Sequence, residues 1–373
     1  MPNEHNGCID PHHMRHALLL AQRSLGLTAP NPAVGCVIVS REGILLGRGR
    51  TAKGGRPHAE ILALAEAGEG ARGATAYVTL EPCSHTGQTP PCAEALIAAG
   101  IAKVVVAVGD PDPRVNGRGL VLLRAAGIVV IEGVCQKEAA DLNAGFFLKV
   151  QHNRPLVTLK IAQSLDGRSA TATGESQWIT GEPARAYGHL LRAHHDAILV
   201  GSCTAGADDP MLTCRLPGLE ARSPLRVVLD SRLKLSPWSK LAQTAQTLPT
   251  LVFTADGSDN PNAGALAACG VDIVALARDA IGRPRLDEVL ATLAGRGITR
   301  LLVEGGASVH ASFLDHGFAD RLEVFSAPMM LGGSGRPAVE TLSVLSLAEA
   351  PRFKMTGRRS LGADLLVSYA RAD

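Results

Sequence analysis

The chain has 373 residues, enough for two or three domains, because one domain usually holds roughly 150 residues. Hydrophobic residues make up 46% of it and its formal net charge is only +2, which argues against a disordered chain and against a strongly basic nucleic-acid binder. Aromatic residues make up only 3%, too few for a surface that stacks on bases. The sequence has neither the apolar core of a signal peptide nor the roughly 18 apolar residues of a membrane span, so we expect a cytoplasmic protein.

The first half of the chain alternates predicted strands and helices. Asp10 and Pro11 begin a helix, since proline is favoured in the first turn after an N-cap residue. Later strands are predicted at 34–39, 44–49, 74–80, 103–108 and 128–131, and helices begin near residues 58, 92 and 119. This alternation predicts a mainly parallel sheet with helices on its faces.

A second α/β series follows Pro155, which cannot continue the helix predicted before it. We therefore place two domains at residues 1–147 and 148–373. In the second domain the predicted strands lie at 155–162, 197–201, 225–230, 250–255, 271–276, 300–306 and 321–327, and the predicted helices at 182–194, 286–294 and 307–316.

His58, Cys83 and Cys92 are the strongest candidates for a metal site. One histidine and two cysteines supply three zinc ligands and leave the fourth position for water, as in catalytic zinc sites. Glu60 then remains free to move protons, which matches the H-x-E and P-C signature of zinc deaminases. The ligands lie at the starts of predicted helices, where thiolates are favoured.

Eight residues separate the two cysteines, whereas the general deaminase signature has two. By spacing alone, a metal site and two core cysteines explain the pattern about equally well, and the upstream His-Ala-Glu favours the metal site. His85 is a competing ligand within this loop, although contact with solvent or substrate is its simpler role. The amide of Asn31 can pair with a pyrimidine edge or belong to an ordinary turn.

Five segments together resemble the bifunctional deaminase-reductases of riboflavin biosynthesis. They are NPAVG at 31–35, HAE at 58–60, EPCSHTGQTPPC at 81–92, GDPDPRVNGRG at 109–119 and SLDGRSATATGESQWIT at 164–180. The resemblance implies an α/β fold with an N-terminal cytidine-deaminase-like three-layer domain and a C-terminal dihydrofolate-reductase-like domain. It also implies that His58, Cys83 and Cys92 bind zinc, that Glu60 moves the proton, and that Asn31 contacts the substrate. That substrate is a 2,5-diaminopyrimidinone with a phosphoribosylamino group, which loses ammonia.

The second half resembles the NADPH-dependent reductase of the same family, which converts the ribosyl group to ribityl. The residues alone say less, because this half has no G-x-G-x-x-G motif between a predicted strand and a predicted helix. Gly305 and Gly306 follow a predicted strand and open a helix, where backbone N–H groups can hold a phosphate or the chain simply turns. The polar segment 204–215 is either a second site or a solvated loop.

The resemblance assigns roles to individual residues of this half. The implied cofactor contacts are Ala162, Trp178, Thr204, Asp208, Ser231, Gly306, Ala307, Ser308, Val309, His310, Ala311 and Ser312. The implied substrate contacts are Ser176, Arg192, Leu212, Arg215 and Glu304, among which the two arginines can clamp a phosphate. The proton donor stays open between Asp208 and Glu304.

Three residues depart from the family pattern: Thr51 and Leu62 replace frequent histidines, and Gln88 replaces an Arg or Lys. They bear on substrate contacts rather than on the reaction. Two rival functions are a deaminase of another base or of nucleic acid with a binding-only second half, and a zinc-stapled interaction protein. The composition argues against the first rival, and Glu60 in place of a fourth ligand argues against the second. We expect a phosphorylated pyrimidine and a second copy of the chain as partners, with neither nucleic acid nor membrane.

Overall fold

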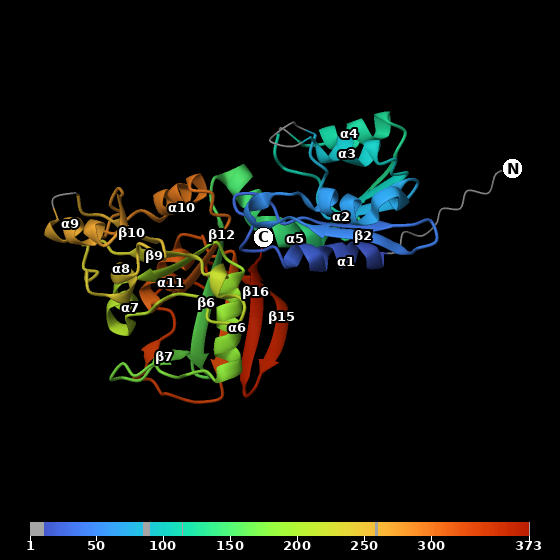
Figure 1. The fold of residues 1–373 in the computed structure, drawn as a ribbon. Coiled ribbons are helices and arrows are strands. Elements are labelled where there is room, and N and C mark those ends of the chain that lie inside the picture. The colour runs from blue at the N-terminus through green and yellow to red at the C-terminus, as the bar shows by residue number, and fades with distance from the viewer. Residues whose placement is uncertain (1–10, 85–89, 114, 258–259, 373) are drawn as a thin grey trace. The chain divides into compact units, whose positions relative to one another are not determined.

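A computed structural model describes residues 11–84, 90–113, 115–257 and 260–372 (Figure 1). The chain divides into two compact units, Met1–His152 and Asn153–Asp373. The division comes at the end of helix α5 (Gln136–His152), which continues beyond residue 147, where we placed the boundary from the sequence. Among the described helices, none has the length and apolar character that a membrane crossing needs.

The first unit contains a five-stranded sheet in the order β2-β1-β3-β4-β5. Strand β1 runs antiparallel to both β2 and β3, whereas β3, β4 and β5 are parallel. The strands are β1 (Gly35–Val39), β2 (Leu45–Arg50), β3 (Thr75–Val78), β4 (Lys103–Val106) and β5 (Val129–Glu132). The helices are α1 (Pro11–Gln22), α2 (Ala59–Ala67), α3 (Cys92–Ala98), α4 (Arg118–Ala125) and α5, with short 3-10 turns η1 (Lys53–Gly55) and η2 (Gly68–Ala71).

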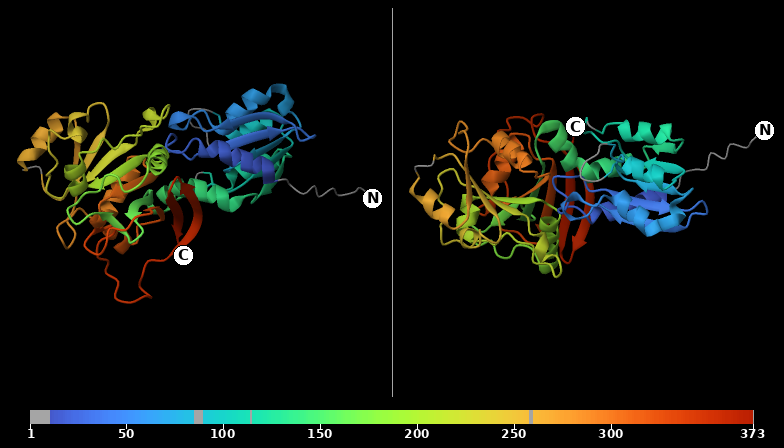
Figure 2. Two further views of the ribbon diagram at one scale, coloured as in Figure 1. Left: turned by 90° about the horizontal axis from the view of Figure 1, so that it is seen from below. Right: turned by 45° about the horizontal axis from the view of Figure 1, so that its top comes forward.

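Helices cover both faces of this sheet, as Figures 1 and 2 show, and the predicted three-layer arrangement is confirmed. Cys36 and Ile38 of β1 pack with α2, α3 and α4, while Val37 and Val39 pack with α1 and α5. This alternation is the two-residue period of a strand whose two faces are both buried. A Cβ on Gly49 of β2 would lie 2.1 Å from the carbonyl oxygen of Ala59, so glycine lets this strand approach the start of α2.

The second unit contains a nine-stranded sheet in the order β11-β10-β9-β8-β12-β6-β13-β16-β15. The strands from β11 to β13 in this order are parallel, and β16 is antiparallel to β13 and to β15. The strands are β6 (Leu156–Ser164), β8 (Ala197–Gly201), β9 (Leu225–Leu229), β10 (Thr250–Thr254), β11 (Asp272–Ala275), β12 (Arg300–Gly305), β13 (Arg321–Ala327), β15 (Phe353–Leu361) and β16 (Asp364–Arg371). Strands β7 (Arg168–Ala170) and β14 (Arg336–Pro337) form a separate pair.

Two hydrophobic cores lie on opposite faces of the parallel part of this sheet. One core joins it to helices α6 (Glu182–Ala193), α7 (Ser202–Asp208), α8 (Lys240–Gln243) and α9 (Pro261–Ala268). The other joins it to α10 (Leu286–Gly295) and α11 (Ala307–Asp315), and a 3-10 turn, η3 (Glu220–Arg222), precedes β9. Because β6, β8, β9 and β12 are parallel, the residues that follow them gather at one edge, where open α/β sheets bind ligands.

Candidate functional site

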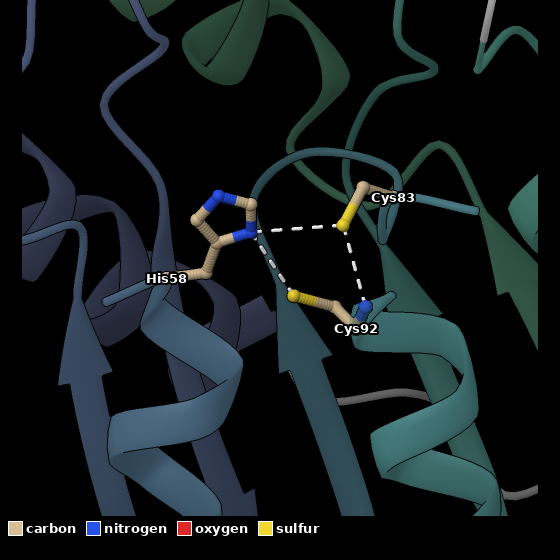
Figure 3. A group of neighbouring side chains, drawn as sticks. All are labelled: His58, Cys83 and Cys92. Carbon is tan, nitrogen blue, oxygen red and sulfur yellow. Dashed lines mark hydrogen bonds between the residues drawn. The ribbon is translucent and has the colours of Figure 1, made fainter. Parts of the chain in front are cut away.

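His58, Cys83 and Cys92 lie together at the ends of three segments (Figure 3). His58 is the N-cap residue of α2, Cys83 follows β3, and Cys92 is the first residue of α3. Nδ1 of His58 lies 3.2 Å from Sγ of Cys92 and 3.6 Å from Sγ of Cys83. Tetrahedral zinc with bonds of about 2.0 and 2.3 Å holds such atoms about 3.5 Å apart, so the donor set fits zinc.

These three side chains also shift one another's pKa values. A hydrogen bond with Cys92 lowers the pKa of the Cys83 thiol to about 4, and the hydrogen bond with Cys83 raises the pKa of His58. The interaction with Cys83 raises the pKa of Cys92. One thiolate therefore forms readily at this place, and a bound cation favours the second.

Glu60 lies in the first turn of α2, two residues after His58, and is only 3% exposed. Burial, and after it the charge of Cys83, raises the pKa of Glu60 to about 7. Among the described residues, the metal-binding group comprises His58, Cys83 and Cys92 but not Glu60. A buried carboxyl with such a pKa both takes and gives protons near neutral pH, which suits a general acid-base group.

We predict that Cys83→Ser abolishes zinc binding. The wild-type chain should hold about one zinc ion, and the variant close to none, because serine replaces one soft thiolate of the three ligands that the described residues supply. Elemental analysis of the purified protein measures the ratio of zinc to protein. Cys203→Ser, which changes an exposed cysteine of the second unit, is the control and should keep its zinc. Retention of zinc by Cys83→Ser would show that the metal is held elsewhere.

The other predicted residues of the first unit differ in their surroundings. Nδ2 of Asn31 donates to the carbonyl oxygen of Gly54 at 3.4 Å, so Asn31 packs against η1. Thr51 is buried, and its hydroxyl accepts the N–H of Val34 at 2.9 Å. Thr51 therefore connects β1 to the end of β2 instead of offering a free side chain to a substrate. Leu62 is partly buried on α2, and both Gln88 and His85 lie outside the described residues.

In the second unit, Arg192 of α6 and Glu304 of β12 form a bidentate ion pair. Nε and Nη2 of Arg192 each donate to one oxygen of Glu304 at 2.7 Å, and Nη1 donates to the carbonyl oxygen of Thr213 at 2.9 Å. These bonds use three of the five N–H donors of Arg192, and the two-arginine phosphate clamp stays a prediction. Arg215 is exposed and remains available to a phosphate.

Glu304 is ionised in this arrangement. Burial alone would raise its pKa, but Arg192, and after it Lys160, hold the pKa of Glu304 at about 2. A carboxylate in this state accepts hydrogen bonds and has no proton to give. Of the two proton donors left open by the sequence, Asp208 at the end of α7 has a pKa raised by burial.

Lys160 of β6 is a candidate that the sequence analysis missed. Its Nζ lies 5.7 Å from the ring centre of Phe325, and it interacts electrostatically with Glu304 and Arg192. Burial lowers the pKa of this ammonium group, which makes it a stronger acid. The signal was present in the sequence, since Lys160 is the one charged residue in the apolar strand segment LVTLKIA.

Several of the predicted cofactor residues lie at the carboxyl edge of the sheet. Ala162 is near the end of β6, and Ser231 follows β9. Gly306 is the N-cap residue of α11, and Oγ1 of Thr204 lies 3.1 Å from where a Cβ on Gly306 would be. Glycine therefore keeps the space between α7 and α11 open, where backbone N–H groups can meet a phosphate.

Residues of the 306–312 run do not all face the same way. His310 and Ala311 are buried, and Nδ1 of His310 lies 3.2 Å from the carbonyl oxygen of Ala338, so these side chains face the protein core. Ala307, Ser308, Val309 and Ser312 are partly exposed. The α-helical period of 3.6 residues accounts for this division.

The remaining predicted contacts lie on the segment before α6 and on the segment after α7. Trp178 is 64% exposed, and the guanidinium of Arg185 lies 4.6 Å from its ring centre. Ser176 is partly exposed, whereas Leu212 is buried and adopts a positive φ of 54°. A positive φ is unusual for leucine, so the segment after α7 is held in a defined turn.

Comparison with known proteins gives the same division into two parts. Residues 9–108 match the cytidine and deoxycytidylate deaminase zinc-binding region, and residues 155–367 match the RibD C-terminal domain. The riboflavin biosynthesis protein RibD of Aquifex aeolicus is 43% identical over 97% of this chain and 99% of its own, and that of Escherichia coli is 41% identical over 97% and 100%.

Two solved structures are similar along nearly the whole chain. Acinetobacter baumannii RibD, form 1, has a TM-score of 0.86 at 40% identity and covers 97% of this chain and 99% of its own. A Thermotoga maritima structure has a TM-score of 0.85 at 35% identity and covers 97% and 98%. It is described as a diaminohydroxyphosphoribosylaminopyrimidine deaminase/5-amino-6-(5-phosphoribosylamino)uracil reductase.

Proposed function

The chain belongs to the RibD family of riboflavin biosynthesis proteins, and from this membership we propose the substrate and the residues of each of its two reactions. The enzyme is a zinc-dependent deaminase and an NADPH-dependent reductase, and the predicted cytidine-deaminase-like and dihydrofolate-reductase-like folds are confirmed. The substrate is 2,5-diamino-6-(5-phosphoribosylamino)pyrimidin-4-one, which is deaminated first and then reduced to the ribityl product. The name of the Thermotoga maritima relative supports this choice.

In the deaminase, His58, Cys83 and Cys92 hold zinc, and Glu60 moves protons. Zinc, when bound, lowers the pKa of a water molecule to about 7 and so supplies a nucleophile at neutral pH. Glu60 takes a proton from the attacking water and passes it to the amino group, so that a C–O bond forms, the C–N bond breaks and ammonia leaves. The amide of Asn31 pairs with the pyrimidine edge. The His-Cys-Cys cluster beside the buried Glu60 is the observation that carries this proposal.

In the reductase, residues at the carboxyl edge of the second sheet would hold the cofactor. The cofactor residues are Ala162, Trp178, Thr204, Asp208, Ser231 and the 306–312 run, and the substrate residues are Ser176, Arg192, Leu212, Arg215 and Glu304. NADPH supplies the hydride that adds to the first carbon of the ring-opened sugar. Glu304, fixed by Arg192, accepts hydrogen bonds from the sugar, and Lys160 gives the proton that the imine nitrogen requires.

The enzyme acts on a small molecule. We propose a cytoplasmic location, because the cytoplasm supplies NADPH and keeps thiolate ligands reduced. The substrate is the free phosphorylated pyrimidine and not a base in nucleic acid. A homo-oligomer is the expected assembly. Strand β15 supports this expectation. It lies at the edge of the large sheet, and its Met355 is 56% exposed. The unpaired backbone groups of an edge strand can pair with a strand of another chain.

The full chain loaded with zinc provides the test. With the diaminopyrimidine phosphate alone it should release ammonia, and later addition of NADPH should lead to oxidation of the cofactor. Absence of ammonia release would refute the deaminase assignment. Release from an oligonucleotide but not from the free pyrimidine would favour the rival nucleic-acid deaminase.

A further inference from the structure

We propose that Glu81 is a positioning residue of the deaminase, which holds the β4–α4 loop (residues 107–113 and 115–117) beside the zinc ligands. This inference rests on the proposed deaminase function. Glu81 is two residues before Cys83 and only 4% exposed. It is neither a ligand of the cluster nor a group with a role in the proton transfer described above.

The carboxylate of Glu81 fastens both ends of this loop. Oε2 accepts the N–H of Gly117 at 2.9 Å and that of Asp110 at 3.4 Å, and Oε1 accepts the N–H of Gly119 at 3.0 Å. The N–H of Glu81 itself donates to the carbonyl oxygen of Val108 at 3.0 Å. One side chain thus satisfies three backbone donors, and buried donors of this kind are costly to leave unpaired.

The strand order places this loop next to the metal cluster. Strands β3 and β4 are parallel neighbours, so Cys83, which follows β3, and the β4–α4 loop emerge at the same sheet edge. Helix α2, which begins directly after His58, contacts β1 and β2 on the other side of β3. A pyrimidine bound at the cluster therefore has His58 on one flank and the β4–α4 loop on the other.

Two further observations show how closely the loop approaches. A Cβ on Gly119 would lie 2.0 Å from the carbonyl oxygen of Pro82, so the first turn of α4 touches the backbone directly before Cys83. Asp110 is 8% exposed, and its Oδ1 accepts the N–H of Asp112 at 2.8 Å. The loop thus carries two buried carboxyl groups, those of Asp110 and Asp112, and Glu81 fixes the backbone of Asp110.

The first test variant is Glu81→Gln, which keeps the shape of the side chain. In either amide orientation, an NH₂ group replaces one acceptor and leaves at least one of the Gly117 and Gly119 donors unpaired. We expect the KM for the diaminopyrimidine phosphate to rise about tenfold, the ratio typical of one lost buried hydrogen bond. The deaminase kcat should change less than about threefold, because the substitution leaves Glu60 and the three proposed zinc ligands unchanged.

Gly119→Ala is the second variant, because its methyl group pushes the first turn of α4 away from the backbone of Pro82 and leaves the Glu81 carboxylate present. The two substitutions disturb one contact, so the rise in KM of the double variant should be smaller than the product of the two single effects. Glu66→Gln is the matched control: Glu66 also accepts a backbone N–H, that of Arg48 at 2.9 Å, but it is exposed at the far end of α2. Its KM should equal that of the wild type.

The reductase of the same chain gives an internal standard for folded protein, and zinc content is measured in parallel. A purely structural role would lower kcat through a smaller active fraction and leave KM unchanged, and that result overturns the proposal. Loss of zinc in Glu81→Gln overturns it as well, since Glu81 would then support the ligands and not the loop. If the wild type releases no ammonia, the proposed function fails and not this inference alone.

Discussion

Glu60→Gln is expected to lower the deaminase kcat by roughly 10²–10⁴-fold, the usual contribution of a positioned acid-base group. Glutamine has nearly the same shape but cannot accept and return a proton, so the step that expels ammonia loses its proton carrier. The zinc content should stay near one per chain, because Glu60 is outside the ligand cluster. Ammonia release in the absence of NADPH is the measurement, and NADPH oxidation with the deaminated substrate should match the wild type.

A matched control for Glu60→Gln is Glu94→Gln. Glu94 also lies in the first turn of a helix and two residues after a ligand, Cys92, but it is exposed to solvent. It should retain full deaminase activity. Equal activity of Glu60→Gln and Glu94→Gln would show that another group moves the proton.

The His-Cys-Cys cluster was predictable because its residues lie at points where local sequence signals are strong. His58 and Cys92 lie at helix starts, and Cys83 follows a buried strand, so motif order along the chain was enough to suggest that they meet. The structure confirms the cluster. The sequence shows Glu81 only as part of a motif, because its partners Asp110, Gly117 and Gly119 lie 29, 36 and 38 residues further along the chain and no local pattern marks them.

Prediction failed where burial depends on distant partners. Lys160 has no charged neighbour in its own strand. Its electrostatic interaction with Glu304 of β12 and Arg192 of α6 depends on the packing of these elements, so the sequence did not indicate it. The ion pair of Arg192 was not predicted either, because its partner Glu304 lies 112 residues away in the sequence. Strands β15 and β16 were not predicted at all, because an edge strand such as β15 alternates weakly, with most of its residues exposed.

Arg192→Met should destabilise the reductase unit by about 3–5 kcal/mol at neutral pH, the usual cost of removing one partner from a buried ion pair. The side chains of Arg192 and Glu304 are only 14% and 9% exposed, so water cannot replace the lost partner. Both tryptophans of the chain, Trp178 and Trp238, belong to the second unit, and their fluorescence during urea unfolding therefore follows this unit within the full chain. Reductase activity should fall together with stability.

The exposed pair of Arg296 and Asp272 in the same unit provides the control. Its side chains are 39% and 52% exposed, and such pairs contribute at most about 1 kcal/mol. Arg296→Met should thus leave the unfolding transition and the reductase nearly unchanged. If Arg192→Met proved no more harmful than Arg296→Met, the buried pair would have no special role.

Acid provides a second test of the same pair. The pKa of Glu304 is about 2 in the folded chain against an ordinary value of 4.5, so its contribution to stability is complete above about pH 4.5 and is lost as the pH falls toward 2. The wild type should lose about 3 kcal/mol over this range through Glu304. Arg192→Met should lose less, because without the guanidinium the pKa of Glu304 is no longer held down. Unfolding curves at several acidic pH values measure the difference.

A double variant separates the structural role of this pair from its role in catalysis. In Arg192→Met with Glu304→Leu neither charge of the pair remains buried, and replacement of a buried ion pair by apolar residues is often neutral for stability. The unfolding free energy should therefore return toward the wild-type value, whereas reduction of the sugar should remain lost, because no carboxylate is left to accept its hydrogen bonds. Recovery of both properties would show that the pair only supports the fold, and Lys160 would then have to act without Glu304.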